Sequence, residues 1–373
     1  RDVAYGTVVT EGEEDAIGAG EMRRASTAYR RPTGVMLFAL LLTVWLTGCG
    51  STQGGGGGGG SGQPDSVTIG YQIIPNAALV AKQRGMVEEA VGVPVEWLGF
   101  DSGASVITAM TSGSIDIALA GTTAASTAIA SDLPIQVIGI HDVIAESEAM
   151  VAKESSGISG LADLRGKTVA VPFGSTTHFA LLQALSDQQI PQGDVEILDL
   201  QPQEMVAAWG SGNIDAGYVW QPSLGEMVND GGQIVLTSKD LLDRGIVTAD
   251  LILAREEFVD EYPDAATGYA RAISDAVEFY RSSPDEATAA VAEETGLEPD
   301  VVQEQMNGLI WLNAEEHLAP EYMGTPEEVG DLADTLKNTG DFMMDQEQIP
   351  SSPELEVYRG KVNPTFFSEV AQQ

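Results

Sequence analysis

Residues 168–185 read TVAVPFGSTTHFALLQAL. The first four residues are small and β-branched, which is typical of a buried strand. A proline and a glycine follow, then the polar run Ser175 to His178, and beyond it apolar side chains recur at helical spacing. A strand, a polar turn and a helix in direct succession form the repeating unit of α/β proteins.

The same unit recurs along the chain, which predicts an α/β fold. Strands are expected over residues 67–71, 93–100, 115–119, 135–140, 168–172, 195–198 and 216–220. Polar or glycine-containing turns follow these strands, and helices follow the turns, the first over residues 77–90 with Asn76 as its N-cap. From residue 260 onward the pattern is mostly helical, with prolines interrupting it.

Several helix starts are expected to meet at one site, because ligands of open α/β sheets bind beyond the carboxyl ends of the strands. A helix start presents unpaired N–H groups and the positive end of its dipole, which together suit an anion. These turns contain no Lys or Arg, so hydroxyls and amides would have to hold the anion. For any single Ser or Thr there, plain N-capping is the alternative interpretation.

The chain is strongly acidic, with 18 Lys and Arg against 56 Asp and Glu in 373 residues and a net charge of −38. This charge excludes a general nucleic-acid or anionic-membrane surface, because both require basic residues. A single cysteine excludes an intramolecular disulfide and a cysteine-cluster metal site. The three histidines are far apart in sequence, so neither a metal nor a cofactor is expected, and His141 and His317 read as loop or surface residues.

The amino-terminal segment reads as a targeting signal. Residues 35–47 form an apolar run of thirteen, too short to span a bilayer, with arginines before it and Leu46-Thr47-Gly48-Cys49 after it. This end resembles the lipobox of bacterial lipoproteins, so residues 1–48 are interpreted as an upstream segment plus signal peptide, and Cys49 as the lipidated residue. A free buried thiol is the alternative. Residues 49–66 contain seven consecutive glycines and are expected to form a flexible tether.

Three motifs resemble one protein family. They are FDSGAS at residues 100–105, VPFGSTTH at residues 171–178 and LQPQEMVAAWGSGNIDAGYVWQP at residues 200–222. In this order they resemble the substrate-binding proteins of ABC importers for taurine, nitrate and aliphatic sulfonates, and among these the taurine-binding branch most. The resemblance is good over residues 67–250 and looser beyond.

The resemblance implies a bilobal type II periplasmic-binding-protein fold, in which two Rossmann-like lobes are joined by two crossover strands. Lobe 1 would comprise residues 67–146 and 251–373, the latter including the C-terminal helices, and lobe 2 residues 147–250. The crossovers would lie near residues 148–151 and 248–253. Lobes of this kind close over a ligand that both of them contact.

Taurine carries a sulfonate and an ammonium group, and the resemblance implies residues for each. For the sulfonate these are Ser175, Thr176, Thr177 and His178 of lobe 2 and Thr122 and Thr123 of lobe 1. For the ammonium they are Glu148 and Asp250, which match acidic positions of the taurine branch.

Three further residues are candidates: Asp101 could help to hold the ammonium, Gln72 could reach the ligand and Trp220 could cover it. These three and His178 also have a structural alternative. Asp101 would otherwise cap the next helix, Gln72 would be a turn residue, Trp220 would be core packing and His178 a structural histidine. Trp209 reads as the buried face of a helix.

The predicted function is therefore a solute-binding lipoprotein that captures taurine and delivers it to ABC permease subunits. Another alkanesulfonate, nitrate or a thiamine precursor is the alternative ligand. An enzyme that uses Ser175 and His178 is disfavoured, because no third orienting group and no nucleophile elbow are present. The protein is expected to be exported, anchored by its lipid to the outer face of the cell membrane or periplasmic, and monomeric.

Overall fold

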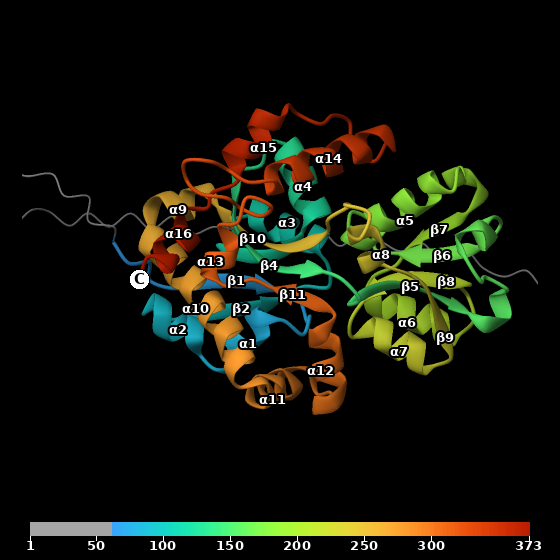
Figure 1. The fold of residues 1–373 in the computed structure, drawn as a ribbon, viewed down its shortest axis with the longest axis horizontal. Coiled ribbons are helices and arrows are strands. Elements are labelled where there is room, and N and C mark those ends of the chain that lie inside the picture. The colour runs from blue at the N-terminus through green and yellow to red at the C-terminus, as the bar shows by residue number, and fades with distance from the viewer. Residues whose placement is uncertain (1–61) are drawn as a thin grey trace, which may run out of the picture. The chain divides into compact units, whose positions relative to one another are not determined.

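The computed structural model describes residues 62–373, and short strands within them form two sheets (Figure 1). The first sheet has the order β11-β4-β10-β3-β1-β2 and the second the order β7-β6-β8-β5-β9. The strands of the first sheet are β1 (Val67–Tyr71), β2 (Val95–Gly99), β3 (Ile117–Gly121), β4 (Ile135–Ile144), β10 (Ala249–Arg255) and β11 (Leu309–Trp311). Those of the second are β5 (Glu148–Lys153), β6 (Thr168–Val171), β7 (Glu196–Asp199), β8 (Ala216–Trp220) and β9 (Gly232–Thr237).

Helices belong to one sheet or the other, and we call each sheet with its helices a lobe. Lobe 1 contains α1 (Ala77–Gln83), α2 (Met86–Val91), α3 (Gly103–Thr111), α4 (Thr122–Ala130), α9 (Glu256–Glu261), α10 (Pro263–Ser282), α11 (Pro284–Thr295), α12 (Pro299–Asn307), α13 (Ala314–His317), α14 (Leu332–Asp345), α15 (Leu355–Lys361) and α16 (Thr365–Ala371). Lobe 2 contains α5 (Thr176–Asp187), α6 (Pro202–Gly210), α7 (Ser223–Asn229) and α8 (Ser238–Leu242), with short 3₁₀ turns at Glu154–Ser156, Leu161–Leu164 and Gln192–Asp194.

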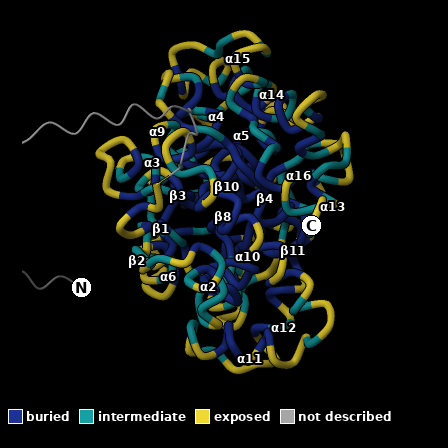
Figure 2. Tube along the Cα trace, turned by 90° about the vertical axis from the view of Figure 1, so that its left-hand side faces the viewer, coloured by how far each residue is buried: buried dark blue, intermediate teal, exposed yellow. Residues whose placement is uncertain are grey.

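Apolar side chains cover both faces of each sheet, as an α/β fold requires. In lobe 1, one face packs against α1, α2 and α10, and the other against α3, α4, α14 and α15. The two faces of the second sheet carry separate clusters of the same kind. Figure 2 shows the central strands β3, β4, β8 and β10 as buried, whereas exposed residues lie on the outer turns and helices.

Each sheet contains one internal strand that runs against its neighbours, and the first sheet also has the antiparallel edge strand β11. Strands β1, β2 and β3 are parallel, but β10 is antiparallel to β3 and β4. Likewise β6 is parallel to β7 and β8, whereas β5 is antiparallel to β8 and β9. The strands β5 and β10 each follow a passage from one lobe to the other. Their first residues therefore lie at the same sheet edge as the last residues of their neighbours β8 and β3.

The two passages, residues 145–147 and 243–248, are tied to each other and to both lobes. The backbone N–H groups of Ala145 and Ser147 both donate to the carbonyl of Gly308 in lobe 1, at 3.1 Å. Ile144 N, at the end of β4 and next to the first passage, donates to Thr248 O of the second passage at 3.0 Å, and Lys239 N of α8 in lobe 2 donates to Ala145 O at 3.1 Å. A Cβ at Gly308 would lie 2.7 Å from Ser147 N, so this close approach depends on glycine. These passages lie near the boundaries predicted at 146/147 and 250/251.

Three predicted elements differ from the structure. The helix expected over residues 77–90 is two helices, because Gly85 adopts a positive φ of 66° between them. Strand β4 continues beyond its expected end at residue 140 to Ile144, and so includes His141 and Asp142. The region after residue 260 also contributes a strand, β11, which pairs with the end of β4.

The interpretation of His141 and His317 as loop or surface residues is wrong, since both are fully buried. His317 Nε2 lies 2.8 Å from the carbonyl of Ile140, and its ring stacks on Phe367 with centroids 3.7 Å apart. His141 Nε2 lies 3.3 Å from the hydroxyl of Tyr269 on α10. Burial lowers the pKa of His141 to about 3 and that of His317 to about 4, so both are neutral near pH 7.

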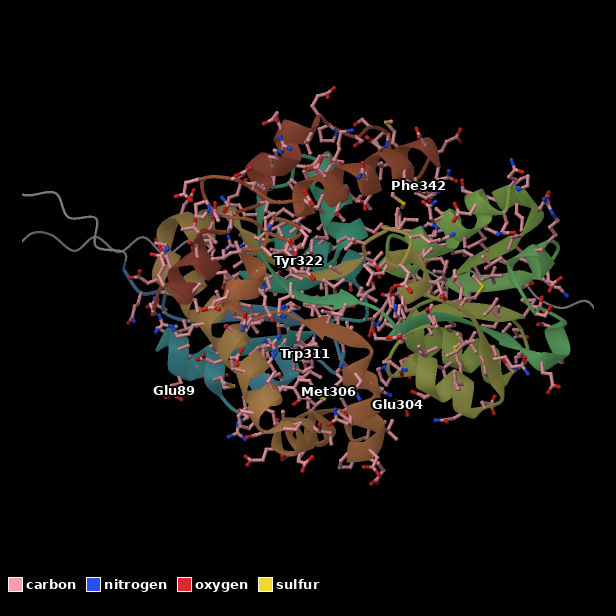
Figure 3. The ribbon with its side chains drawn as sticks, in the orientation of Figure 1. Glu89, Glu304, Met306, Trp311, Tyr322 and Phe342 are labelled. Carbon is pink, nitrogen blue, oxygen red and sulfur yellow. The ribbon has the colours of Figure 1, made fainter. Side chains whose placement is uncertain are left out.

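A second contact between the lobes lies away from the sheets. The ring of Phe342 on α14 meets Phe179 on α5 edge to face, with centroids 5.2 Å apart, and Figure 3 labels Phe342 at the end of α14 that faces α5. Leu182, Met343 and Ile349 complete this apolar cluster. Helix α5 is thus held by lobe 1 along its side as well as by its own sheet.

No helix between residues 62 and 373 is long and apolar enough to cross a bilayer. The predicted signal peptide, Cys49 and most of the glycine tether lie outside the described residues.

Phe367 offers a test of the lobe 1 core. Its ring is fully buried and fills the space above Gly139, where a Cβ would collide with it. We expect Phe367→Ala to lower the free energy of unfolding by about 3–5 kcal/mol, because a large cavity remains. Urea unfolding followed by circular dichroism measures this loss. Val357→Ala, at a side chain that is 41% exposed, is the control and should change stability little.

Candidate functional site

A small cavity lies between the two sheets, at the edge where the crossover strands begin. Its volume is about 20 Å³, roughly the space of one water molecule. Both lobes line it: from lobe 1 Gln72, Ile74, Gly103, Gly121, Ala124 and Asp250, and from lobe 2 Glu148, Ser175, Thr176 and Trp220.

Strand direction explains why these residues meet. Because β10 is antiparallel to β3, its early residue Asp250 pairs with Gly121 at the end of β3. Because β5 is antiparallel to β8, its first residue Glu148 pairs with Trp220 at the end of β8. Each crossover strand thus delivers a carboxyl group to the carboxyl end of its parallel neighbour, which is where α/β folds bind ligands.

Glu148 is only 4% exposed and is held by two hydroxyl groups. Thr176 Oγ1, at the start of α5, donates to Oε1, and Ser238 Oγ, at the start of α8, donates to Oε2 at 3.1 Å. Burial raises the pKa of Glu148 to about 8, although both hydroxyl donors act in the opposite direction.

Asp250 faces Glu148 from the other lobe and has a second carboxyl group behind it. Burial raises the pKa of Asp250 to about 7. Asp142 pairs with Asp250 across β4 and β10, is fully buried, and accepts a hydrogen bond from Asn76 Nδ2 at 3.1 Å. Burial and the neighbouring Asp250 raise the pKa of Asp142 well above its usual range.

No basic side chain balances these three acids. Among residues 62–373, every ion pair lies elsewhere. The cavity lining contains neither Lys nor Arg. Within the same part of the chain, no cluster of His, Cys, Asp and Glu is arranged to hold a metal ion. The site therefore suits a ligand that brings its own positive charge.

The start of α5 supplies the hydroxyl side of the cavity. Ser175 is the N-cap: its Oγ accepts from His178 N at 3.1 Å and donates to Pro172 O at 2.6 Å. Thr177 contacts the Ser175 hydroxyl at 2.8 Å and does not line the cavity. Ser175 and Thr176 do line the cavity, so Ser175 both caps α5 and faces the cavity.

Thr122 and Thr123 begin α4, directly beyond Gly121. Both are fully buried, and their hydroxyl oxygens have no hydrogen-bond partner within the described chain. Neither lines the cavity in this closed arrangement, although Gly121 and Ala124 from the same turn do. Their predicted contact with a ligand stays a prediction.

The remaining candidates lie at the cavity or around its rim. Gln72 lines it and donates weakly from Nε2 to Leu119 O at 3.5 Å, while Trp220 lines it and also joins the lobe 1 core. Asp101 is exposed in an outer hollow of about 360 Å³ that Gln72 and Trp220 share. The N-cap of α3 is Ser102 rather than Asp101.

His178 lies outside the cavity lining. Its Nδ1 accepts from Gly174 N at 3.2 Å, and its ring stacks on Phe173 with centroids 4.5 Å apart. Burial lowers the pKa of His178 to about 4. The contact between His178 and Ser175 runs through the backbone N–H and not through the imidazole, so the geometry offers no general base for Ser175.

Sequence analysis missed Asp142, Asn76 and Ser238. The signal for Asp142 was present, because a carboxyl group inside an otherwise apolar strand is rarely buried without a partner. Asn76 was identified as an N-cap, and its Oδ1 does accept from Ala78 N at 3.1 Å. Its second bond, to Asp142, joins residues 66 positions apart and has no local sequence signal.

Comparison with known proteins gives consistent matches. A profile of the NMT1-like family matches residues 60–295. The taurine-binding periplasmic protein of Escherichia coli (strain K12) is 33% identical over 295 residues, covering 78% of this chain and 89% of that protein. The putative aliphatic sulfonates-binding protein of Bacillus subtilis (strain 168) is 27% identical over 284 residues, covering 74% and 83%.

Among solved structures, the alkanesulfonate-binding protein SsuA of Xanthomonas axonopodis pv. citri, bound to MOPS, superposes with a TM-score of 0.68. Its sequence identity is 21%, and the match covers 80% of this chain and 98% of that one. At this identity the likeness shows a shared fold. The predicted bilobal type II periplasmic-binding-protein fold is thereby confirmed.

A substitution at Gly121 tests whether the two lobes close on the cavity. A Cβ at this lobe 1 position would lie 2.7 Å from Cγ2 of Thr176 in lobe 2. We expect Gly121→Ala to disfavour the closed form by about 1–3 kcal/mol, as overpacking does, and to raise the radius of gyration measured by small-angle X-ray scattering.

Two variants serve as controls for Gly121→Ala. Gly210→Ala adds a methyl group where nothing lies within 4 Å and should leave the radius unchanged. Adding Thr176→Ser to Gly121→Ala removes the colliding methyl group but keeps the hydroxyl, and should restore closure. An unchanged radius in Gly121→Ala would contradict the closed contact.

Proposed function

The chain belongs to the NMT1-like family, and from this membership we propose that it is the solute-binding component of an ABC importer that captures taurine between its lobes. It acts by binding and not by catalysis. The relatives named above are a taurine-binding protein and two sulfonate-binding proteins, which supports a sulfonate as the ligand class. Taurine itself is the more specific proposal.

One observation carries the choice of taurine: two buried acids from different lobes face one cavity without a counter-charge. Glu148 and Asp250 are 4% and 6% exposed. A buried carboxylate is unfavourable unless a charge or several donors compensate it. The ammonium group of taurine would supply that charge, whereas a simple alkanesulfonate or nitrate would add a second negative charge beside the acids.

The sulfonate group would be held by the helix starts. Helices α4 and α5 both begin at the cavity, one from each lobe, with Gly121 and Ser175 as their N-caps. Their first backbone N–H groups and dipoles favour an anion. The hydroxyls of Thr122 and Thr123 support this placement, since they are buried polar groups without a hydrogen-bond partner among residues 62–373.

Capture would occur by closure of the two lobes. The cavity of about 20 Å³ is too small for taurine, so the lobes must separate to admit it and settle around it. Asp250 belongs to lobe 1 and Glu148 to lobe 2, and therefore both acids contact one ammonium group only when the lobes are shut. The passages at 145–147 and 243–248 are the places where such a hinge would bend.

The proposal extends to the cellular context. One of the relatives is a periplasmic protein, which supports export of this chain. Lipidation at Cys49, delivery to ABC permease subunits, and a monomeric state follow from the sequence pattern and the family resemblance.

A thermal-shift panel tests the ligand class. We expect taurine to raise the melting temperature of the full chain, because a ligand that binds only the folded state stabilises it. Ethanesulfonate should give a smaller shift, and nitrate and sulfate none. A larger shift with ethanesulfonate than with taurine would move the proposal to a simple alkanesulfonate.

The acids are tested by isosteric amides. Glu148→Gln and Asp250→Asn should each weaken taurine binding by about 1.5–3 kcal/mol, the usual contribution of a charged hydrogen bond, as measured by isothermal titration calorimetry. Ethanesulfonate lacks the ammonium group and should bind these variants no more weakly than the wild type. Unchanged taurine affinity in both variants would remove the ammonium site.

A further inference from the structure

Asp142 is a buried acid that the proposed function leaves without a role. It is fully buried and does not line the cavity. It stands directly behind Asp250, its partner across the antiparallel strands β4 and β10, so the two carboxyl side chains are neighbours on the same face of the sheet. A hydrogen bond between two carboxyl groups requires that one of them carry a proton.

The surroundings of Asp142 contain no cation that would let both acids ionise. Its Oδ2 accepts from the neutral amide of Asn76, and its Oδ1 has no donor among residues 62–373 other than a protonated Asp250. The ionisable groups that act on it are Asp250 on β10 and Glu148 on β5, both acids. Without a cation beside them, two acids this close in a buried site do not both lose their protons near neutral pH.

The other elements packed around this end of β4 contribute no charge of the opposite sign. On β3 the residue opposite Asp250 is Gly121, and on β11 the residue paired with Asp142 is Trp311. His141, the neighbouring residue of β4, and His317 of α13 are both kept neutral by burial. Tyr269 of α10, beside His141, has a pKa raised by burial and is also neutral.

We propose that Asp142 is a positioning residue that shares one proton with Asp250 in the ligand-free protein, and that an ammonium group entering the cavity releases this proton to solvent. The inference rests on the proposed function, since it needs a cationic ligand. In this step the O–H bond of the shared proton breaks, the proton passes to water or buffer, and the ligand ammonium keeps all its protons. Asp142, fixed by Asn76, then holds the Asp250 carboxylate towards the cavity by repulsion from behind.

The direction of the pH dependence follows from this exchange. Asp250 has a pKa raised to about 7 without ligand, and a bound ammonium would lower it. Proton release on binding means that taurine affinity rises with pH and levels off only above the pKa values of the free site. Glu148, with a pKa of about 8, also releases a proton when an ammonium binds, and this raises the affinity with pH in the same way. The contribution of Asp142 is therefore measured by comparing the wild type with a variant at Asp142.

Calorimetry counts the proton directly. Taurine is titrated into the full chain near pH 6 in two buffers of different protonation enthalpy, and the difference in heat gives the protons released per ligand bound. We expect Asp142→Asn to bind taurine but to release about one proton fewer than the wild type, because an amide at this position cannot carry the shared proton. Glu321→Gln, which removes an exposed acid, is the matched control and should release as many protons as the wild type.

An equal proton count in Asp142→Asn and the wild type would overturn the inference. A merely structural role for Asp142 would change affinity or stability but not this count. Asp142→Ser is the second variant, should Asp142→Asn fail to fold, and carries the same expectation.

A ligand-free measurement separates this inference from the proposed function. Because burial raises the pKa of the folded pair, its stabilising contribution is complete at low pH and is lost as pH rises through about 7. We expect the melting temperature to fall between about pH 5 and about pH 8, and to fall less in Asp142→Asn than in Glu321→Gln. Equal slopes would remove the shared proton whether or not taurine binds. Different slopes together with no taurine binding would support the shared proton and contradict only the ligand.

Discussion

The burial of three carboxyl groups without a cation is the constraint on which the rest of this structure depends. Glu148, Asp250 and Asp142 are all within a few per cent of complete burial, and each has its pKa raised. Such an arrangement is unfavourable for the protein alone. A ligand with a positive charge would compensate the buried carboxylates, and the same arrangement would therefore favour a cationic group.

The directions of the strands place these acids where the two lobes meet. The strands β5 and β10 each begin with or near an acid, and each follows a passage between lobes. A ligand charge placed between them therefore acts on both lobes and on both passages at once. The close fit of Gly121 against Thr176 and the contact of Phe342 with Phe179 show that closure is also a matter of packing, at the cavity and beside it.

Much of the fold was accessible from local patterns. Alternating strands, polar turns and helices predicted the α/β class, and Asn76, Ser175 and Trp209 occupy the cap and buried positions that their neighbours implied. The failures came where a residue's environment is made by distant parts of the chain. His141 and His317 read as surface residues because their partners, Tyr269 and Ile140, lie 128 and 177 positions away.

The candidate site was likewise predictable from the sequence only in part. The sequence by itself determined the hydroxyl-rich helix starts, because turn chemistry is a local property of the chain, and its family resemblance implied the acids Glu148 and Asp250. Only the tertiary structure decided that Asp142 stands behind Asp250, that Thr177 and His178 lie outside the cavity lining, and that Gly121 meets Thr176. Those facts depend on strand pairing and lobe contact. Both join residues that are far apart in sequence, and therefore neither produces a signal in the adjacent residues.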